Sequence, residues 1–173
     1  METLLKSRKF DVVRRMVTAS DSRPHAVDYM RHPGAVVVLP LLSDDELVLL
    51  RNFRPAVDQT LWELPAGTLD VAGEKPAAAA LRELEEEAGF RAGRIEPLCA
   101  FYPSPGVMNE YIRAFVARDL RRTRQRLEPT ERIVTRTVKL SAALEMVRDG
   151  RIEDGKTIIT LLRWTMARRE HAG

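Results

Sequence analysis

The feature that most constrains how this chain can fold is a helix with many carboxylates on one side. Residues 76–88 begin with proline, continue in strong helix formers and stop before Gly89, a residue common at helix C-termini. Side chains three and four positions apart share a helix face, so Glu83, Glu86 and Glu87 converge. Like charges at this spacing lower helix stability by about a few tenths of a kcal/mol. The patch therefore needs either solvent or a bound cation.

Two interpretations of this acidic patch are open from its residues alone. Composition favours a solvated face, because runs of like charge usually lie on a surface, and Arg82 could neutralise part of the patch. The alternative is a cation site, since oxygen-only ligands suit hard divalent ions such as Mg²⁺ or Mn²⁺. The sequence around the helix decides between them.

The composition describes one ordinary globular domain. A chain of 173 residues with 45% hydrophobic and 31% charged residues can bury a core of its own. No apolar run approaches the roughly 20 residues of a membrane-spanning helix, and residues 1–10 lack the apolar stretch of a secretory signal. The single cysteine, Cys99, excludes an intramolecular disulfide and a cysteine-based zinc site. We therefore expect a cytoplasmic protein without a membrane partner.

The apolar patterns predict strands, a helix, more strands and then two helices. The polar triplet 43–45 between two apolar runs is typical of a hairpin. The expected strands are 11–17, 35–42, 46–51, 112–117 and 132–138, and the expected later helices are 141–149 and 156–170. This order indicates an α/β or α+β sandwich.

A longer pattern surrounds the acidic helix. From Gly67 the chain reads GTLDVAGEKPAAAALRELEEEAGF, which resembles the Nudix box of the Nudix hydrolase family. Six residues separate Gly67 from Glu74, one more than in the box, and they lie in a loop before the helix. The matching positions are Gly67, Glu74, Arg82, Glu83, Leu84, Glu86, Glu87, Gly89 and Phe90. The resemblance implies a Nudix-type sandwich, with a mixed β-sheet packed between helices.

The same resemblance implies an enzyme that cleaves a nucleoside diphosphate linked to another group. Nudix hydrolases use divalent cations held on the helix of the box, because phosphate oxygens meet an acidic surface favourably only through cations. By resemblance, Glu83 and Glu87 are the first choice as metal ligands and Glu86 is a third. The Ala66 carbonyl, just before the box, completes the expected site. Mg²⁺ is the expected cofactor, with Mn²⁺ as a substitute.

Four further box residues are expected to be structural. Arg82 and Glu74 should hold the loop and the helix together by an ion pair rather than touch substrate. Gly67 opens the box, and Gly89 ends its helix.

Segments outside the box resemble the ADP-ribose pyrophosphatase branch of the family. They are RNFRPAV at 51–57, LWELPAGTLD at 61–70 and YPSPGVMNE at 102–110. In that branch an arginine at the position of Arg54 contacts the pyrophosphate or the terminal ribose, and Arg51 is nearby in sequence. Glu110 matches a glutamate near the terminal ribose. A solvated strand end for Arg51 and a structural ion pair for Glu110 are the alternatives.

The general base is expected from a loop late in the chain. RLEPTERIV at 126–134 corresponds to that loop in the family and offers Glu128 and Glu131. Glu131 matches the family glutamate better, Glu128 stays open, and Glu86 on the helix is a further candidate. A carboxylate on a mobile loop can deprotonate water without adding charge to the metal site before substrate arrives.

Two classes of function follow from the resemblance. The first is a Mg²⁺-dependent hydrolase that splits ADP-ribose into AMP and ribose 5-phosphate, or acts on GDP-mannose or another sugar nucleotide. The second is a module that senses such a ligand without turnover, against which the intact carboxylate set argues. The basic run 118–126 lacks the interleaved aromatic residues of single-strand binding, so no nucleic-acid partner is expected.

The chain is expected to have two parts. Residues 1–34 are predicted to be an N-terminal β segment, and residues 35–173 the Nudix hydrolase domain. Members of the branch commonly act as homodimers in which an N-terminal sheet reaches across. The resemblance therefore implies a homodimer.

Overall fold

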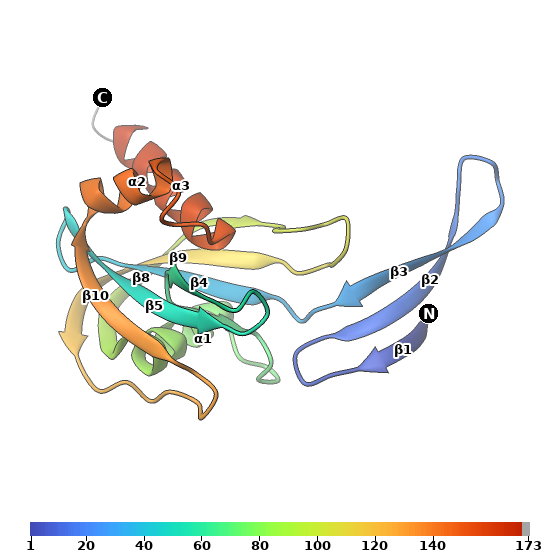
Figure 1. Cartoon of the computed structure of the whole chain (residues 1–173), viewed down its shortest axis with the longest axis horizontal. Helices are drawn as coiled ribbons and strands as arrows, with labels where there is room; N and C mark the ends of the chain where they lie inside the picture. The colour runs from blue at the N-terminus through green and yellow to red at the C-terminus, as the bar shows by residue number, and fades with distance from the viewer. Residues whose placement is uncertain (171–173) are drawn as a thin grey trace.

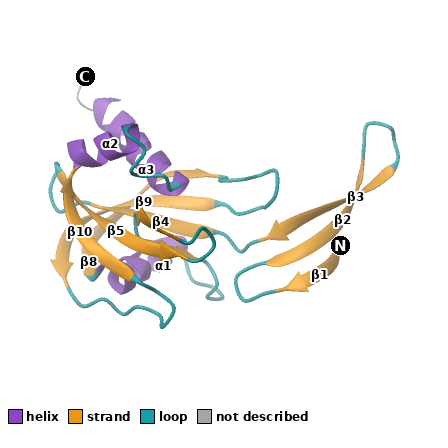
Figure 2. Cartoon of the chain, viewed as in Figure 1, coloured by secondary structure: helices purple, strands orange, loops and turns teal. Residues whose placement is uncertain are grey.

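Two β-sheets and the helices packed on them form the body of the protein (Figures 1 and 2). The computed structural model describes residues 1–170, and no helix within that range is long and apolar enough to cross a membrane. A mixed sheet has the order β7-β4-β9-β8, with β4 and β9 parallel, and an antiparallel sheet has the order β10-β5-β6. The elements are β4 (Ala35–Pro40), β5 (Glu46–Arg54), β6 (Gln59–Glu63), β7 (Ala66–Thr68), α1 (Pro76–Glu83), β8 (Phe90–Phe101), β9 (Ile112–Arg122), β10 (Ile133–Lys139), α2 (Leu140–Arg148) and α3 (Gly155–Glu170).

Strand β4 lies at the centre of the body and is buried on both faces. Val37 and Leu39 pack in a core with residues of α2 and α3, whereas Val36 and Val38 pack in a second core with residues of α1. Successive strand side chains point to opposite faces, so a strand covered on both sides needs an unbroken apolar run. The sandwich of a mixed sheet between helices, expected from the sequence, is confirmed.

The acidic helix changes character along its length. The α-helix ends at Glu83 and continues as a π-helical turn, η1 (Leu84–Ala88), which stops at Gly89. Gly89 has φ of 71°, a left-handed conformation that suits glycine and ends the helix. The prediction of regular α-helical spacing to residue 88 is therefore wrong for the last turn. Helix propensity does not distinguish the i→i+5 hydrogen bonds of a π turn, which is frequent at functional sites.

Strands β4 and β5 are consecutive in sequence but belong to different sheets. Within the described residues, one isolated bridge between Leu41 and Leu47 spans the polar turn at 43–45. Strand β4 pairs with β7 and β9, and β5 pairs with β6 and β10. The predicted hairpin is therefore wrong, although both strands exist. A polar turn marks where the chain reverses, and it does not say whether the next strand pairs with the first or packs in a second sheet.

The N-terminal residues form a separate antiparallel sheet that extends to one side of the body (Figure 1). Its strands are β1 (Glu2–Lys6), β2 (Asp11–Thr18) and β3 (Pro24–Arg31). The sequence predicted only the second of them, because charged residues hide the pattern of the other two. Leu5, Met16 and Val27 in this sheet are exposed. Strand β8 was also not predicted, since Gly93 and Pro97 interrupt its sequence.

Candidate active site

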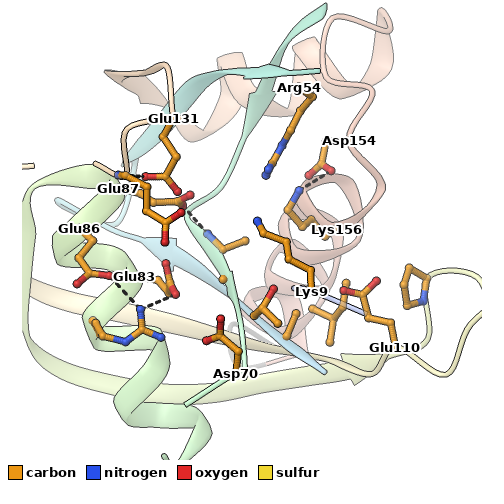
Figure 3. A pocket seen from close by; sticks show the side chains of 18 of the residues that line it. Lys9, Arg54, Asp70, Glu83, Glu86, Glu87, Glu110, Glu131, Asp154 and Lys156 are labelled. Atoms are coloured by element: carbon orange, nitrogen blue, oxygen red, sulfur yellow. Dashed lines mark hydrogen bonds and ion pairs between the residues drawn. The ribbon is translucent and has the colours of Figure 1, made fainter. Parts of the chain in front are cut away.

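A cavity of about 400 Å³ lies beside the acidic helix (Figure 3). Its walls come from the β1–β2 turn, the end of β5, strand β7, the α1–η1 helix, the loop before β10 and the start of α3. The acidic residues that line it are Asp70, Glu83, Glu86, Glu87, Glu110, Glu128, Glu131 and Asp154, and the basic ones are Arg8, Lys9, Arg54, Arg82, Arg126 and Lys156. The fold thus brings charged groups from distant parts of the sequence around one space.

Glu87 is the most deeply buried carboxylate of this cavity. The residue is 5% exposed, and the Ala66 N–H donates a hydrogen bond to its Oε2 at 2.8 Å. Burial raises the pKa of Glu87 to about 8; the charges of Glu83 and Glu131 add to the shift, and the Ala66 N–H opposes it. The ionised form of Glu87 therefore has too little positive charge around it.

Glu83 packs against the backbone of Gly67. A Cβ atom added at position 67 would lie 1.9 Å from the carboxyl carbon of Glu83, so any residue other than glycine would displace this side chain. Burial raises the pKa of Glu83, and Arg82 partly opposes the shift. Gly67 thus allows the close approach of the Glu83 carboxylate to the backbone of β7.

Arg82 links the loop before the helix to two of the helix carboxylates. Its Nε and Nη2 donate to the two carboxylate oxygens of Glu74, each at 3.1 Å. Its Nη1 donates to Glu83 at 2.7 Å and to Glu86 at 2.9 Å. The expected ion pair between Arg82 and Glu74 is therefore present. Arg82 also neutralises part of the acidic patch, which the sequence had left open.

The helix carboxylates fit a divalent cation by their chemistry. Among residues 1–170, no group of three or more His, Cys, Asp or Glu side chains already has the geometry of a metal site. Glu83, Glu86 and Glu87 nevertheless line one cavity, and burial opposes the charge of two of them. A bound cation would compensate that charge, and oxygen donors suit Mg²⁺ or Mn²⁺.

A second buried glutamate, Glu63, lies behind the facing wall of the cavity and is 1% exposed. Arg54 donates from Nε and Nη2 to the two oxygens of Glu63 at 2.7 and 2.5 Å, and Lys156 donates to Oε2 at 3.0 Å. Lys156 also donates to Asp154 at 2.7 Å. Burial acts to raise the pKa of Glu63, but Arg54 and Lys156 together hold it below its ordinary value. We call these four residues, Arg54, Glu63, Asp154 and Lys156, the Glu63 cluster.

The loop before β10 places two carboxylates at the cavity with different partners. The Glu128 N–H donates to Oε2 of Glu131 at 2.7 Å, and the Glu131 N–H donates to the Glu128 carbonyl at 2.9 Å. Glu131 points toward Glu87 (Figure 3), and its charge contributes to the raised pKa values of Glu83 and Glu87. Glu128 instead accepts a hydrogen bond from Nη2 of Arg8 at 2.7 Å. Glu131 is thus directed at the acidic helix and Glu128 at the N-terminal sheet.

Comparison with known proteins identifies the family. Residues 30–161 match the family model described as NUDIX domain. The chain belongs to the Nudix family. It is 32% identical over 158 residues to an ADP-ribose pyrophosphatase of Bacillus subtilis (strain 168), which covers 90% of this chain and 85% of that protein. It is also 32% identical over 166 residues to a GDP-mannose pyrophosphatase of Salmonella typhimurium, which covers 91% of this chain and 85% of that protein.

A solved structure shares the fold. It is described as an ADP compounds hydrolase, has 23% sequence identity and a TM-score of 0.83, and covers 98% of this chain and 92% of its own. Membership of the Nudix family confirms the resemblance that was inferred from the box and its flanking segments.

The structure brings most of the predicted Nudix site residues to the one cavity. They are Arg54, Ala66, Gly67, Arg82, Glu83, Glu86, Glu87, Glu110, Glu128 and Glu131. Glu85, on the same helical segment, pairs with Arg91 at 3.0 Å and is not among the residues that line the cavity.

Arg51 and Glu110 lie in different surroundings. The guanidinium of Arg51 lies over the ring of Trp62, 5.0 Å from its centroid, and Arg51 is not among the residues that line the cavity. Glu110 lines the cavity, with Oε1 3.7 Å from Nδ1 of His32. That nitrogen accepts a hydrogen bond from the Gly34 N–H, so Glu110 keeps its carboxylate available toward the cavity.

Six charged residues that line the cavity of this Nudix protein were not predicted from the sequence: Arg8, Lys9, Asp70, Arg126, Asp154 and Lys156. Arg8 and Lys9 reach the cavity from the β1–β2 turn, and no local pattern predicts that contact. Figure 3 shows Lys9 at the cavity. Asp154 accepts hydrogen bonds from the N–H and hydroxyl of Thr157, which makes it the N-cap of α3. An aspartate just before a predicted helix is typical of an N-cap, so the sequence alone could have predicted that Lys156 lies in the first turn of α3.

Proposed function

We propose that this Nudix protein is a Mg²⁺-dependent hydrolase that cleaves the pyrophosphate of ADP-ribose, or of a similar nucleoside diphosphate sugar, to AMP and ribose 5-phosphate. The observation that carries the proposal is the charge arrangement of one cavity. Glu87, a buried carboxylate that pairs with no cation among residues 1–170, and Glu83, a partly buried carboxylate paired with Arg82, face Arg54 across that cavity. A diphosphate with a divalent cation satisfies both sides, because the cation meets the carboxylates and phosphate oxygens meet the arginine.

In this proposal the helix carboxylates hold the cation and the loop supplies the base. Mg²⁺ would be held by Glu83, Glu86 and Glu87, with the Ala66 carbonyl beside them, and it would polarise phosphate oxygens and stabilise the leaving group. Glu131 accepts a proton from the attacking water, whose oxygen forms the new bond to phosphorus. The bond from that phosphorus to the bridging oxygen breaks, and the bridging oxygen leaves with the other phosphate.

The role of base is proposed for Glu131 rather than Glu128 or Glu86. Glu131 points toward Glu87, whereas Glu128 is paired with Arg8. Glu86 is paired with Arg82 and belongs to the metal-holding face. Arg54 is proposed to contact the diphosphate, and Glu110 to accept hydrogen bonds from the terminal sugar.

GDP-mannose is the second candidate substrate. The relative named GDP-mannose pyrophosphatase is as similar in sequence as the one named ADP-ribose pyrophosphatase, and both extend over most of the chain. A panel of purified protein with ADP-ribose, GDP-mannose and other sugar nucleotides, each with Mg²⁺ and with EDTA, tests the proposal. Release of AMP that requires Mg²⁺ supports it. Faster release of GMP would favour GDP-mannose as the substrate. Binding without turnover of any substrate would favour a ligand sensor without catalytic activity.

We also propose that the protein acts as a cytoplasmic homodimer through residues 1–34. The support is the separate N-terminal sheet, which extends to one side of the body (Figure 1) and on which Leu5, Met16 and Val27 are exposed. Sedimentation of the full chain and of a variant with Met16→Lys and Val27→Glu tests it. A monomeric wild-type protein would contradict the dimer.

A further inference from the structure

A second groove lies on the antiparallel sheet, outside the cavity described above. It has a volume of about 650 Å³ and is formed by β5, β6, the first half of β10 and the loop before β10. Leu47 and Leu49 on the same face of β5 are buried in the core with residues of α2 and α3. No residue of a described helix lines the groove itself, which is therefore open to a ligand. The lining residues are Arg51, Phe53, Thr60, Trp62, Leu127, Arg132, Ile133, Val134 and Arg136.

The groove has positive charge without acidic neighbours. Arg51, Arg132 and Arg136 line it, and no aspartate or glutamate of residues 1–170 does. None of the three arginines forms an ion pair within that range, and all three are exposed. Anions are attracted to such a surface, and phosphate oxygens fit the planar fork of a guanidinium. The groove therefore favours an anionic ligand.

Two of these arginines are stacked on aromatic rings. The guanidinium of Arg51 lies 5.0 Å from the ring centroid of Trp62, and that of Arg132 lies 5.6 Å from the ring centroid of Phe53. The two stacks are two positions apart along β5, because Arg51 pairs with Trp62 across β6 and the Phe53 N–H donates to the Arg132 carbonyl at 3.2 Å. Nucleobases stack on guanidinium planes as well as on aromatic rings. The groove thus offers a stacking surface beside its positive charge.

We propose that this groove is an accessory binding site for a nucleoside monophosphate. The base stacks beside Arg51 and Trp62, and the phosphate is bound by Arg132 and Arg136. The volume is in the range of small-molecule sites, and two stacks suit one nucleotide better than a single strand, whose sites span about 4–16 nucleotides. Among the described residues that line the groove, no carboxylate or amide side chain can read a base edge, so AMP and GMP should bind alike. The inference does not depend on the proposed hydrolase activity.

The loop before β10 contributes to both the groove and the cavity. Leu127 and Arg132 line the groove, whereas Glu128 and Glu131 line the cavity. A nucleotide in the groove would contact both ends of this loop and restrict its motion. Local opening of a loop is measured by amide hydrogen exchange, so occupancy of the groove should slow exchange in residues 127–133. A nucleotide bound outside the cavity would thus act on the loop that holds both carboxylates.

The competing explanation is that the arginines only shield aromatic rings from water. Shielding takes one arginine for each ring, and Arg51 over Trp62 and Arg132 over Phe53 already provide it. Arg136 stacks on no ring among residues 1–170, and its Nη1 donates to a neighbouring backbone carbonyl. A third like charge on one groove adds repulsion that shielding does not require and that a bound anion would relieve.

The test is calorimetric titration of the full chain with AMP in EDTA. Arg136→Met removes the charge of an exposed side chain outside the cavity, and the affinity for AMP should weaken by about 10-fold, in line with the loss of one charge-assisted hydrogen bond. Arg121→Met is the matched control, on an exposed strand arginine that also forms no ion pair among residues 1–170, and it should leave the affinity unchanged. Ribose 5-phosphate lacks the base and should bind the wild type about 10-fold more weakly than AMP, whereas GMP should bind within about threefold of AMP.

Fluorescence tests the stacking directly. The chain has two tryptophans, so Trp164→Phe leaves Trp62 as the single reporter, and AMP should quench it with the dissociation constant that calorimetry gives. If Trp164→Phe does not fold, the same titration on the wild type measures the quenching of Trp62 over a constant contribution of Trp164. Hydrogen exchange of residues 127–133 should slow with AMP in the wild type and less in Arg136→Met at the same AMP concentration.

Each outcome decides for or against the accessory site. An AMP dissociation constant of the wild type above about 1 mM overturns the proposal, as does an unchanged AMP affinity in Arg136→Met. Equal affinity for AMP and ribose 5-phosphate, or AMP binding that leaves the fluorescence of Trp62 unchanged, also overturns it, because the base would then not be stacked. Weaker AMP binding in Arg136→Met together with quenching of Trp62 supports the proposal, whether or not the protein hydrolyses ADP-ribose.

Discussion

Two buried glutamates on opposite sides of the cavity have pKa values shifted in opposite directions. Glu87, on the acidic helix, is 5% exposed and has its pKa raised to about 8. Glu63, behind the facing wall, is 1% exposed, yet its pKa lies below the ordinary value. Burial acts to raise the pKa of both side chains, so the difference comes from their partners.

The comparison shows on which side of the cavity the chain itself compensates the charge of the buried glutamate. Glu63 has Arg54 and Lys156 within hydrogen-bonding distance, so its charge is compensated. Glu87 has one backbone N–H and lies near the charges of Glu83 and Glu131. A buried charge without a partner is costly, and a site that keeps one is a candidate for an external cation. This difference supports the proposed metal ion at the acidic wall and the proposed diphosphate contact of Arg54 at the facing wall, which we call the anion wall.

The largest loss of kcat is expected from substitutions on the acidic wall. Glu87→Gln and Glu83→Gln keep side-chain volume and remove the charge that holds the cation, so kcat should fall by several orders of magnitude. Removing like charge should leave thermal stability in EDTA unchanged or higher. Steady-state kinetics over a Mg²⁺ range, together with Mn²⁺ binding followed by electron paramagnetic resonance, measures both parts. Near-normal Mg²⁺-dependent turnover in the two variants would remove the metal assignment.

Substitutions of the loop carboxylates should lower kcat without weakening metal binding, unlike substitutions of the helix carboxylates. If Glu131 is the base, Glu131→Gln lowers kcat by about 10²–10⁴-fold while Mn²⁺ affinity and KM stay near normal. Glu128→Gln is the matched control three positions earlier, and it should lose only the ion pair with Arg8. A larger kcat loss for Glu128→Gln would move the role of base to that residue. If both variants keep kcat within about threefold, this loop does not supply the base.

A smaller effect, on KM rather than kcat, is expected at the anion wall. Arg54→Lys keeps a positive charge for Glu63 but cannot serve Glu63 and a phosphate with one planar fork, so KM should rise by about 10-fold. Arg51→Lys tests the other arginine predicted from the sequence, whose guanidinium lies over Trp62 outside the cavity. An equal rise in KM for Arg51→Lys would show that Arg51 reaches substrate after all.

The acidic wall could be predicted from sequence because it is local. Its carboxylates, the preceding glycine and the helix end lie within one continuous motif, and helix spacing alone brings the carboxylates to one side. The π turn at Leu84–Ala88 could not be predicted, because propensity does not specify which backbone hydrogen bonds form. The carboxylates face one cavity despite it.

The anion wall was harder to predict because its members come together only in the folded chain. Glu63 and Lys156 are 93 positions apart, and the contact between them depends on where α3 packs. Lys9 is further still from that helix and reaches the cavity through the turn of a sheet that was only partly predicted. The relative placement of Arg51 and Arg54 could be predicted from the sequence. They are three positions apart on one strand, so strand alternation places them on opposite faces.

The smallest expected effect is a difference in how the two buried glutamates change stability with pH. The pKa of Glu63 is lowered on folding, so this residue contributes stability above its unfolded pKa near 4.5, and that contribution is lost as the pH falls through the folded value. In metal-free protein the pKa of Glu87 is raised to about 8, so its contribution is present at low pH and is lost as the pH rises through about 8.

Thermal unfolding in EDTA should show both effects as Tm differences between each Gln variant and the wild type. Between pH 6 and pH 4 the advantage of the wild type over Glu63→Gln should shrink by about a few °C, and between pH 6 and pH 8.5 the wild type should lose about a few °C relative to Glu87→Gln. Saturating Mg²⁺ should abolish the second difference and leave the first, because a cation compensates Glu87 alone; parallel curves for both variants would mean that the two walls do not differ in charge compensation.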